Sequence, residues 1–189
     1  EMNTSIVSFE ETEKVATSMQ KSGYFKDVTD IHKAVVKILA GREMGFGPFA
    51  SMRGVYIIQG TPALAANLMA AAVKRSGRYN YHVNQMTDAV CEIEYFEDGK
   101  PSGISTFTAD DARRAGTQNM GKFPRNMLFA RAMSNGVRWY CPDVLGGSAV
   151  YTPEELGATV NEDGDVIDAA FTETPAPVVN VTNVSNTVQ

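Results

Sequence analysis

The sequence of 189 residues has little cysteine, no long hydrophobic run and, in its last quarter, no positive charge. Cys91 and Cys141 are too few and too isolated for a disulfide framework, so we interpret them as reduced thiols. The longest mostly apolar stretch, residues 54–73, is interrupted by the turn-forming sequence QGTP, which argues against a membrane-spanning helix. The first residues lack the basic and apolar regions of a signal peptide. We therefore expect a cytoplasmic protein without a membrane partner.

Positive charge is unevenly distributed, although the net charge is −5. Residues 1–138 hold all 17 lysines and arginines and 14 acidic residues, whereas residues 139–189 hold eight acidic residues and no basic one. This asymmetry indicates either a face that binds nucleic acid or another polyanion, with an acidic tail, or an ordinary solvated surface. Residues 112–142 contain no carboxylate but six cations: Arg113, Arg114, Lys122, Arg125, Arg131 and Arg138.

The first part of the chain predicts two helices, a strand and a third helix. A capping-box pattern begins a helix over residues 9–21, and apolar residues at helical spacing predict a second helix over residues 30–41. The segment GVYIIQG predicts a short strand. Thr61 before Pro62 is typical of an N-cap followed by proline at the first helical position, so ALAANLMAAAVKRSG predicts the next helix.

Three alternating segments follow, RYNYHVNQM, AVCEIEYFED and KPSGISTFT, with an Asp98–Gly99 turn between the last two. Asp110–Asp111 suit the first turn of a short helix, and a long helix is expected over Pro124–Tyr140. The predicted fold class is α+β, an antiparallel β-meander packed with helices. We expect one domain over residues 1–157 and a flexible tail over residues 158–189, which is acidic and then rich in valine, asparagine and threonine.

The last predicted helix separates its apolar and cationic side chains. At about 100° per residue, Arg131 and Arg138 lie about 20° apart, opposite an apolar face that includes Trp139. No acidic residue of this helix neutralises them. Two interpretations remain open. The guanidinium groups contact nucleic-acid phosphates, to which arginine presents a planar fork, or they pair with carboxylates from elsewhere, such as Asp143 or the acidic tail.

The segment FPRNMLFARAMSNGVRWYCPDVLGGSAVYTPEELG resembles the closing part of phage recombination proteins of the RecT/Redβ type. The similarity lies in Pro-Arg-x-Met-Leu, Ala-Arg-Ala and Pro-Asp, followed by Tyr-Thr-x-Glu-Glu-Leu. REMGFGPFASMRGVYIIQGTPALAANLMAAAVKRSG is similar to an earlier part of the same group, so the resemblance covers roughly residues 28–157. It implies a β-β-β-α core, a basic groove for single-stranded DNA, and rings or helical filaments that anneal complementary strands without ATP.

The resemblance assigns DNA binding to Arg125, Arg131 and Arg138. From charge and position we add further cations and one tyrosine, because single-strand binding combines a cationic track with rings on which bases stack. Trp139 is left out, since its helical angle places it on the core face. The predicted DNA-binding residues are Lys74, Arg75, Arg78, Tyr79, Arg113, Arg114, Lys122, Arg125, Arg131 and Arg138.

The predicted function is therefore single-strand annealing in the host cytoplasm, without catalysis and without a cofactor. Expected partners are single-stranded DNA, further copies of the chain, and a phage exonuclease or a host single-strand binding protein. One alternative is a phage inhibitor of a host nucleic-acid-binding defence complex. Another is a metal-dependent nuclease with Asp110–Asp111 or Glu154–Glu155 as magnesium ligands, although the helix dipole also explains carboxylates at helix starts.

Overall fold

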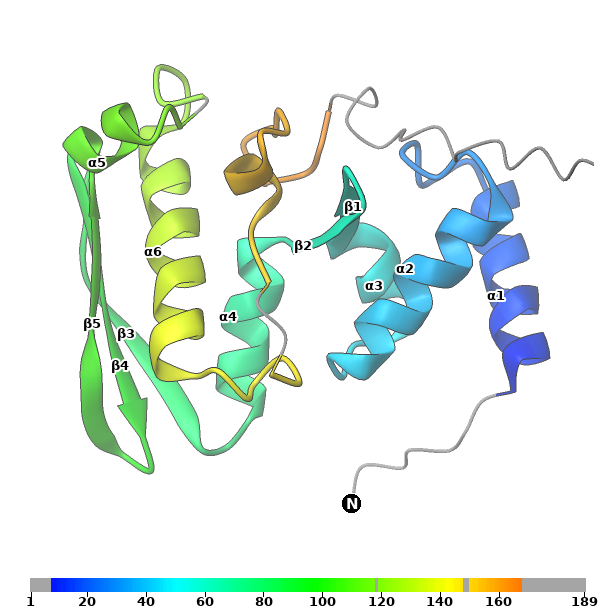
Figure 1. The fold of residues 1–189 in the computed structure, drawn as a ribbon, viewed down its shortest axis with the longest axis horizontal. Helices are drawn as coiled ribbons and strands as arrows, with labels where there is room; N and C mark the ends of the chain where they lie inside the picture. The colour runs from blue at the N-terminus through cyan, green and yellow to red at the C-terminus, as the bar shows by residue number, and fades with distance from the viewer. Residues whose placement is uncertain (1–7, 118, 148–149, 168–189) are drawn as a thin grey trace, which may run out of the picture.

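The computed structural model describes residues 8–117, 119–147 and 150–167. These residues contain six α-helices, a short 3-10 helix and two antiparallel sheets, which confirms the predicted α+β class. Figure 1 shows two lobes side by side. The helical lobe (residues 8–54) contains α1, α2 and α3, and the sheet lobe (residues 66–145) contains a three-stranded sheet with α4 and α6 on one face.

The helical lobe begins with the two helices predicted from their caps. In α1 (Phe9–Lys21) the capping box is complete, because the backbone N–H of Ser8 donates to Glu11 and the Ser8 hydroxyl accepts from the Glu11 backbone. Asp30 caps α2 (Ile31–Glu43). The helix α3 (Pro48–Gly54), which the sequence analysis did not predict, begins with proline at its first position. A small core of its own holds these helices together.

A hairpin between the lobes replaces the helix start predicted at Thr61–Pro62. Gln59 and Gly60 have φ of 49° and 78°, as a two-residue hairpin turn requires, and join β1 (Val55–Ile58) to β2 (Thr61–Leu64). The helix α4 (Ala66–Arg75) starts only after this strand. The prediction was wrong here because the left-handed turn outweighs the Thr-Pro signal, and an exposed strand position tolerates proline.

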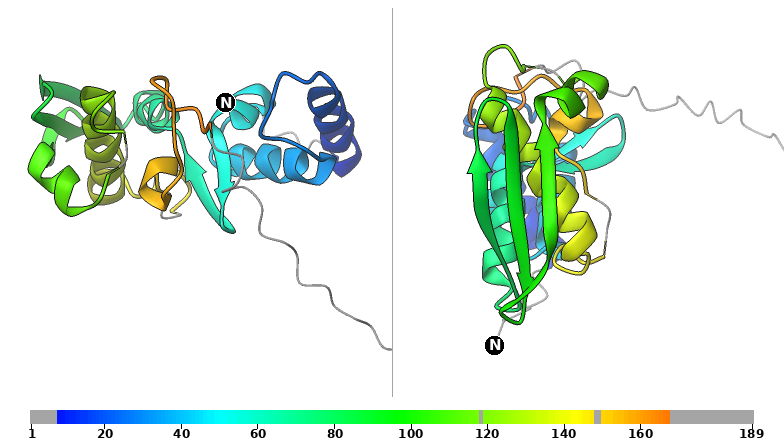
Figure 2. Two further views of the ribbon diagram at one scale, coloured as in Figure 1. Left: turned by 90° about the horizontal axis from the view of Figure 1, so that it is seen from above. Right: turned by 90° about the vertical axis from the view of Figure 1, so that its left-hand side faces the viewer.

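The predicted β-meander is confirmed. β3 (Tyr79–Met86), β4 (Val90–Glu97) and β5 (Lys100–Thr108) pair in that order, and Asp98–Gly99 forms the second turn with φ of 50° and 76°. The short helix α5 (Ala109–Arg114) follows with its own capping box. The right-hand view of Figure 2 shows the outer face of this sheet without a covering helix.

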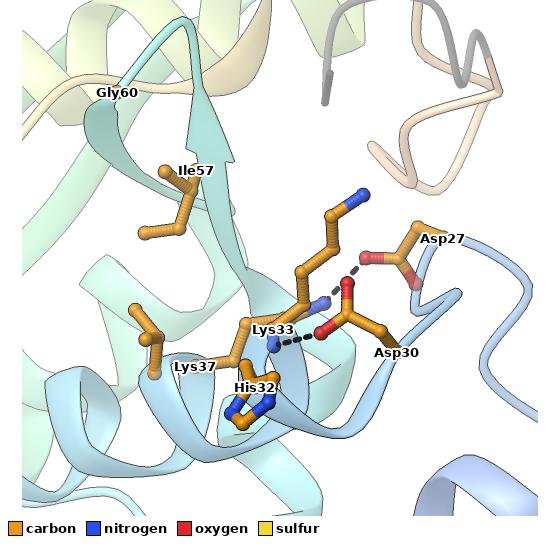
Figure 3. A pocket seen from close by; sticks show the side chains of 8 residues that line it. Asp27, Asp30, His32, Lys33, Lys37, Ile57 and Gly60 are labelled. Atoms are coloured by element: carbon orange, nitrogen blue, oxygen red, sulfur yellow. Dashed lines mark hydrogen bonds and ion pairs between the residues drawn. The ribbon is translucent and has the colours of Figure 1, made fainter. Parts of the chain in front are cut away.

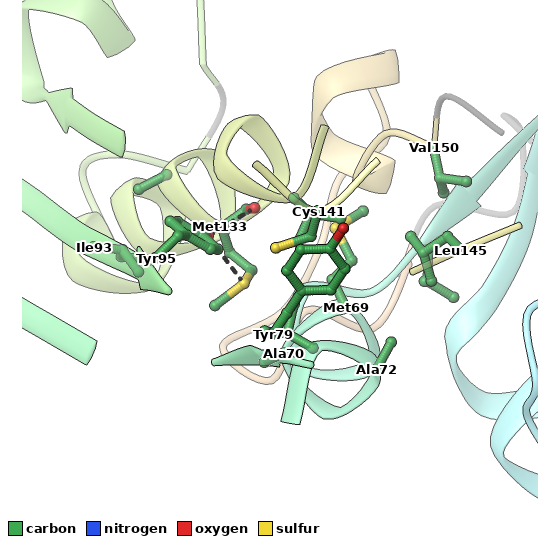
Figure 4. Packing of buried hydrophobic residues seen from close by; sticks show 14 of the residues in the cluster. Met69, Ala70, Ala72, Tyr79, Ile93, Tyr95, Met133, Cys141, Leu145 and Val150 are labelled. Carbon is green, nitrogen blue, oxygen red and sulfur yellow. Dashed lines mark hydrogen bonds between the residues drawn. The ribbon is translucent and has the colours of Figure 1, made fainter. Parts of the chain in front are cut away.

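The helix α6 (Pro124–Tyr140) packs against the inner face of the sheet (Figure 4). The Tyr95 hydroxyl donates to the Met133 carbonyl at 3.2 Å, and the Ser105 hydroxyl donates to the Ala132 carbonyl at 2.8 Å. A Cβ on Gly136 would lie 2.1 Å from the Tyr95 ring, so glycine is what lets helix and strand approach so closely.

The described chain continues to fold beyond the predicted domain end at residue 157. Ala158 and Val160 are at most 1% exposed, and Val160 pairs with Val166 in a small bridge. Residues 158–167, which were predicted to belong to the flexible tail, thus include buried side chains, of which Ala158 packs against the β1–β2 hairpin. Residues 168–189 lie outside the described part. No helix within the described ranges combines the length and apolarity that a membrane crossing needs.

We expect Gly136→Ala to lower the free energy of unfolding by about 1–3 kcal/mol, because the added methyl group meets the Tyr95 ring in a packed core. Urea denaturation measures this value. Gly121→Ala is the matched control, since its Cβ would have no neighbour within 4 Å. Equal stability of the two variants would contradict the packing described.

Candidate nucleic-acid interface

The structure divides the ten predicted DNA-binding residues into three groups. The first lies where α4 ends and β3 begins: Lys74, Arg75, Arg78 and Tyr79. The second lies at the opposite end of the strands, around α5 and the start of α6: Arg113, Arg114, Lys122 and Arg125. The third lies on α6: Arg131 and Arg138. The ten residues thus do not share one end of the sheet.

The two arginines of α6 pair with one buried carboxylate. Arg131 and Arg138 lie 3.5 Å and 3.2 Å from Glu155, whose side chain is only 3% exposed. Glu155 belongs to the 3-10 helix η1 (Pro153–Leu156). The structure therefore supports the ion-pair interpretation for both arginines, with Glu155 rather than Asp143 or the tail as the carboxylate.

Further contacts hold these guanidinium groups in place. Arg131 lies over the Phe107 ring and Arg138 over the Tyr151 ring, at 5.0 Å and 4.5 Å from the centroids. Arg138 also donates to the Asn135 side chain at 2.6 Å. Both arginine side chains are about four-fifths buried. Arg138 therefore uses most of its hydrogen-bonding capacity inside the protein, whereas the buried Nε of Arg131 has no hydrogen-bond partner among the described residues.

The cations of the second group are exposed and form weak pairs. Arg113 and Arg114 bind Asp110 and Asp111 within the same helix at 2.8 Å and 2.5 Å, and a further pair joins Arg125 to Asp88 at 2.7 Å. Lys122 makes no side-chain ion pair with any described residue. Exposed pairs contribute little and are screened by salt, so phosphates can compete for these cations.

The carboxylates of the nuclease alternative have structural partners. Hydrogen bonds from Thr108 hold the pKa of Asp111 below its usual value, as expected of a helix cap. Burial raises the pKa of Glu154, and Glu155 binds the two arginines of α6. Within the described ranges, three or more histidine, cysteine or acidic side chains are nowhere grouped so that they could hold a metal ion.

Trp139, predicted on the core face, is 57% exposed. Leu128 and Ala132 lie near the same helical angle and are fully buried, so the angle itself is right. Trp139 differs in burial because of its position along α6. It belongs to the last helical turn and lies beside the first residues of β5, which do not cover it. Periodicity gives the face of a helix but not where its covering layer ends.

Trp139 lines a shallow pocket of about 650 Å³ in the sheet lobe. Tyr140 lies edge-on to it, with the ring centroids 6.2 Å apart. Arg78 and Lys100 supply positive charge, and the pocket also contains acidic side chains, of which Glu97 binds Arg78. Lys100 pairs with no carboxylate in the described part of the chain. An exposed ring in one pocket with two cations is the chemistry with which proteins hold an unpaired base and its phosphate.

Tyr79, predicted as a stacking residue, is instead a structural anchor. It is 6% exposed, and its hydroxyl donates to Asp143 at 2.5 Å, while Arg78 binds the other oxygen of Asp143 at 3.2 Å. Burial, together with this hydrogen bond, raises the pKa of Tyr79 to about 12. The same bond holds the pKa of Asp143 below its usual range.

Lys74 and Arg75 bind backbone carbonyl groups. Lys74 donates to the Tyr81 carbonyl at 3.1 Å and lies over the Tyr81 ring. Arg75 donates to the Met44 carbonyl at 3.1 Å and lies over Phe46, so it links the two lobes. Both residues lie in the last turn of α4.

A second pocket, of about 540 Å³, lies between α2 and the β1–β2 hairpin (Figure 3). Its buried ammonium group, Lys37, pairs with Asp27 at 2.5 Å. Burial lowers the pKa of Lys37, and Asp27 opposes that shift. Two hydrogen bonds join the polar groups drawn in Figure 3, from Lys37 to Asp27 and from the backbone N–H of Lys33 to Asp30.

Comparison of the chain with models of known protein families, with curated proteins and with solved structures finds no match. The similarity to the RecT/Redβ type therefore rests on the motif residues alone. Of these, Arg131, Arg138 and Glu155 of the closing motif form the buried ion-pair cluster, and Asp143 anchors Tyr79.

We expect Arg138→Gln to lower the free energy of unfolding by about 3 kcal/mol, because the change leaves the Glu155 carboxylate buried with a weakened ion-pair network. Chemical denaturation measures the loss. Arg113→Gln removes a pair in which both side chains are more than 70% exposed, and we expect it to cost less than about 1 kcal/mol. Comparable losses in both variants would contradict the structural role of the cluster.

Tyr79→Phe should lower the free energy of unfolding by about 1.5 kcal/mol at neutral pH, since it removes a hydrogen bond to a charged group. The bond lowers the folded-state pKa of Asp143, so its contribution is present above the usual carboxyl pKa and is lost as the pH falls through the folded value. Denaturation curves at several pH values test this. Tyr140→Phe removes a bond to the Ile104 carbonyl and should show no such pH dependence.

Proposed function

We propose that this chain binds single-stranded DNA and anneals complementary strands without ATP. The observation that carries the proposal is the exposed Trp139 in a pocket with Arg78 and Lys100. Binding of single strands without sequence preference combines stacking on such a ring with cations along the backbone. The motif resemblance to RecT/Redβ proteins supports the same function.

Trp139 and Lys100 provide the first contact in this proposal. A base stacks on the indole ring, and the adjacent phosphate binds the ammonium group of Lys100. Arg78 exchanges an exposed carboxylate for a phosphate, which changes its energy little because both partners are solvated anions. The cations of the second group, on the far end of the sheet lobe, bind the backbone as the strand continues.

Annealing then needs no bond to be made or broken by the protein. Each copy holds a few nucleotides weakly, and an assembly of copies in a ring or filament holds a long strand with its unstacked bases free to pair. A complementary strand is retained once enough bases match. A phage exonuclease or a host single-strand binding protein would supply or release the strand.

The intrinsic fluorescence of the chain tests the binding step directly, because Trp139 is its single tryptophan. We expect single-stranded oligothymidine to quench this emission, and the logarithm of affinity to fall linearly with the logarithm of salt, with a slope of about −0.7 per phosphate contacted. Emission that does not respond to the oligonucleotide, together with no binding of labelled DNA, would refute the proposal. Fragmentation of the DNA with magnesium would favour the nuclease alternative.

Variants locate the site. Trp139→Ala should weaken binding of labelled single-stranded DNA by about tenfold and slow annealing of complementary strands, since one stacked base contributes about 1–3 kcal/mol. Phe9→Ala removes a ring that is 65% exposed in the helical lobe and should leave both unchanged. If the two variants bind alike, Trp139 is not the stacking residue.

A further inference from the structure

Three aromatic rings form an exposed cluster on the helical lobe. Tyr24 and Phe49 are 62% and 53% exposed, and Phe25 lies beneath them at 8%. The ring centroids are 5.0–5.9 Å apart, so the three rings form one continuous apolar surface. Large apolar side chains that gather on a surface mark a place where another segment binds.

A recess of about 230 Å³ adjoins this cluster. Tyr24, Met52 and Tyr56 line it, and Val166 forms part of its wall. A cavity of about 150 Å³ in a protein interior admits a benzene molecule, so this recess is large enough for one aromatic side chain. We use the name aromatic recess for this recess together with the adjoining rings of Tyr24, Phe25 and Phe49. It fits a phenyl ring.

Two acidic and two basic side chains line the aromatic recess, and because Asp27 is already bound to Lys37, the two cations favour an acidic occupant. Lys26 lies in its lining and is exposed. Arg53, also in the lining, has a side chain that is 50% exposed and lies 3.7 Å from Asp165, which is a long and solvated ion pair. Both cations can therefore bind a further carboxylate.

The last described residues of the chain lie at the aromatic recess. Asp165 and Val166 line the recess, and the described residues end at the exposed Ile167. The next seven residues read DAAFTET, with two carboxylates, no cation and Phe171 at the centre. Phe171 is the fourth residue after Ile167, and four residues span at most about 14 Å, so its ring can reach the recess that Val166 borders.

From this juxtaposition we propose that the aromatic recess binds residues 168–174 of the same chain, with the ring of Phe171 against Tyr24 and Phe49. Asp168 and Glu173 then lie near Arg53 and Lys26. The contact holds the acidic segment on the helical lobe, away from the Trp139 pocket, so this proposal is independent of the nucleic-acid function.

A single tryptophan placed at the proposed contact tests this in the full chain. In the double variant Trp139→Phe/Phe171→Trp, we expect blue-shifted emission and weak quenching by acrylamide, because the indole is buried. The control Trp139→Phe/Val178→Trp places the probe further along the same segment and should show the emission and quenching of an exposed indole. Circular dichroism establishes that both variants fold.

Adding Phe49→Ala to the Phe171→Trp variant should shift its emission to that of the control and restore quenching, and Arg53→Gln should do so in part. Emission that already matches the control, or that does not respond to Phe49→Ala, would overturn the proposal. A blue shift that is lost on dilution would also overturn it, because the occupant would then be the segment of a second copy.

Discussion

The ion pairs of the buried Glu155 carboxylate with Arg131 and Arg138 are the interaction on which the attachment of the closing segment to the sheet lobe depends. A buried carboxylate is costly unless it is paired, and here two guanidinium groups pair with it, each of which lies over an aromatic ring. The pairing fixes η1 against α6. Tyr151, just before η1, forms a parallel bridge with Ala63 of β2, so the segment that the ion pairs hold against α6 also contacts the hairpin.

The helix α6 consequently serves two purposes along its length. Its middle binds the closing motif through arginine, while its last turn extends beyond the covered part of the sheet and exposes Trp139. The turn after α6 is held by Asp143 through Arg78 and Tyr79. The ring that we propose to stack on DNA thus lies on a rigid helix end, which lowers the conformational cost of binding a base.

Local signals in the sequence predicted most of the fold but little of the site. Caps such as Ser8–Glu11 and strict alternation in β4 depend only on neighbouring residues, so these elements could be read directly. The strand at Thr61–Leu64 could not, because a two-residue turn competed with a helix signal. Ion-pair partners are even harder to predict from the sequence. Helical periodicity placed Arg131 and Arg138 on one face, but only the tertiary fold brings Glu155 to them.

The difference between neighbours in the sequence and partners in space also explains why charge alone was misleading for the arginines of α6. Arginines in residues 112–142, a segment without a carboxylate, suggested a cationic stripe, yet all five have an acidic partner in the fold. Two of the surfaces that the fold leaves uncovered are the tryptophan at one end of the sheet lobe and the aromatic recess on the helical lobe. Because these surfaces lie on different lobes, a strand of DNA and the acidic segment need not compete for one cationic face. Residues 1–138 carry all the positive charge and residues 139–189 only negative charge, and ion pairs within the fold join some of these opposite charges.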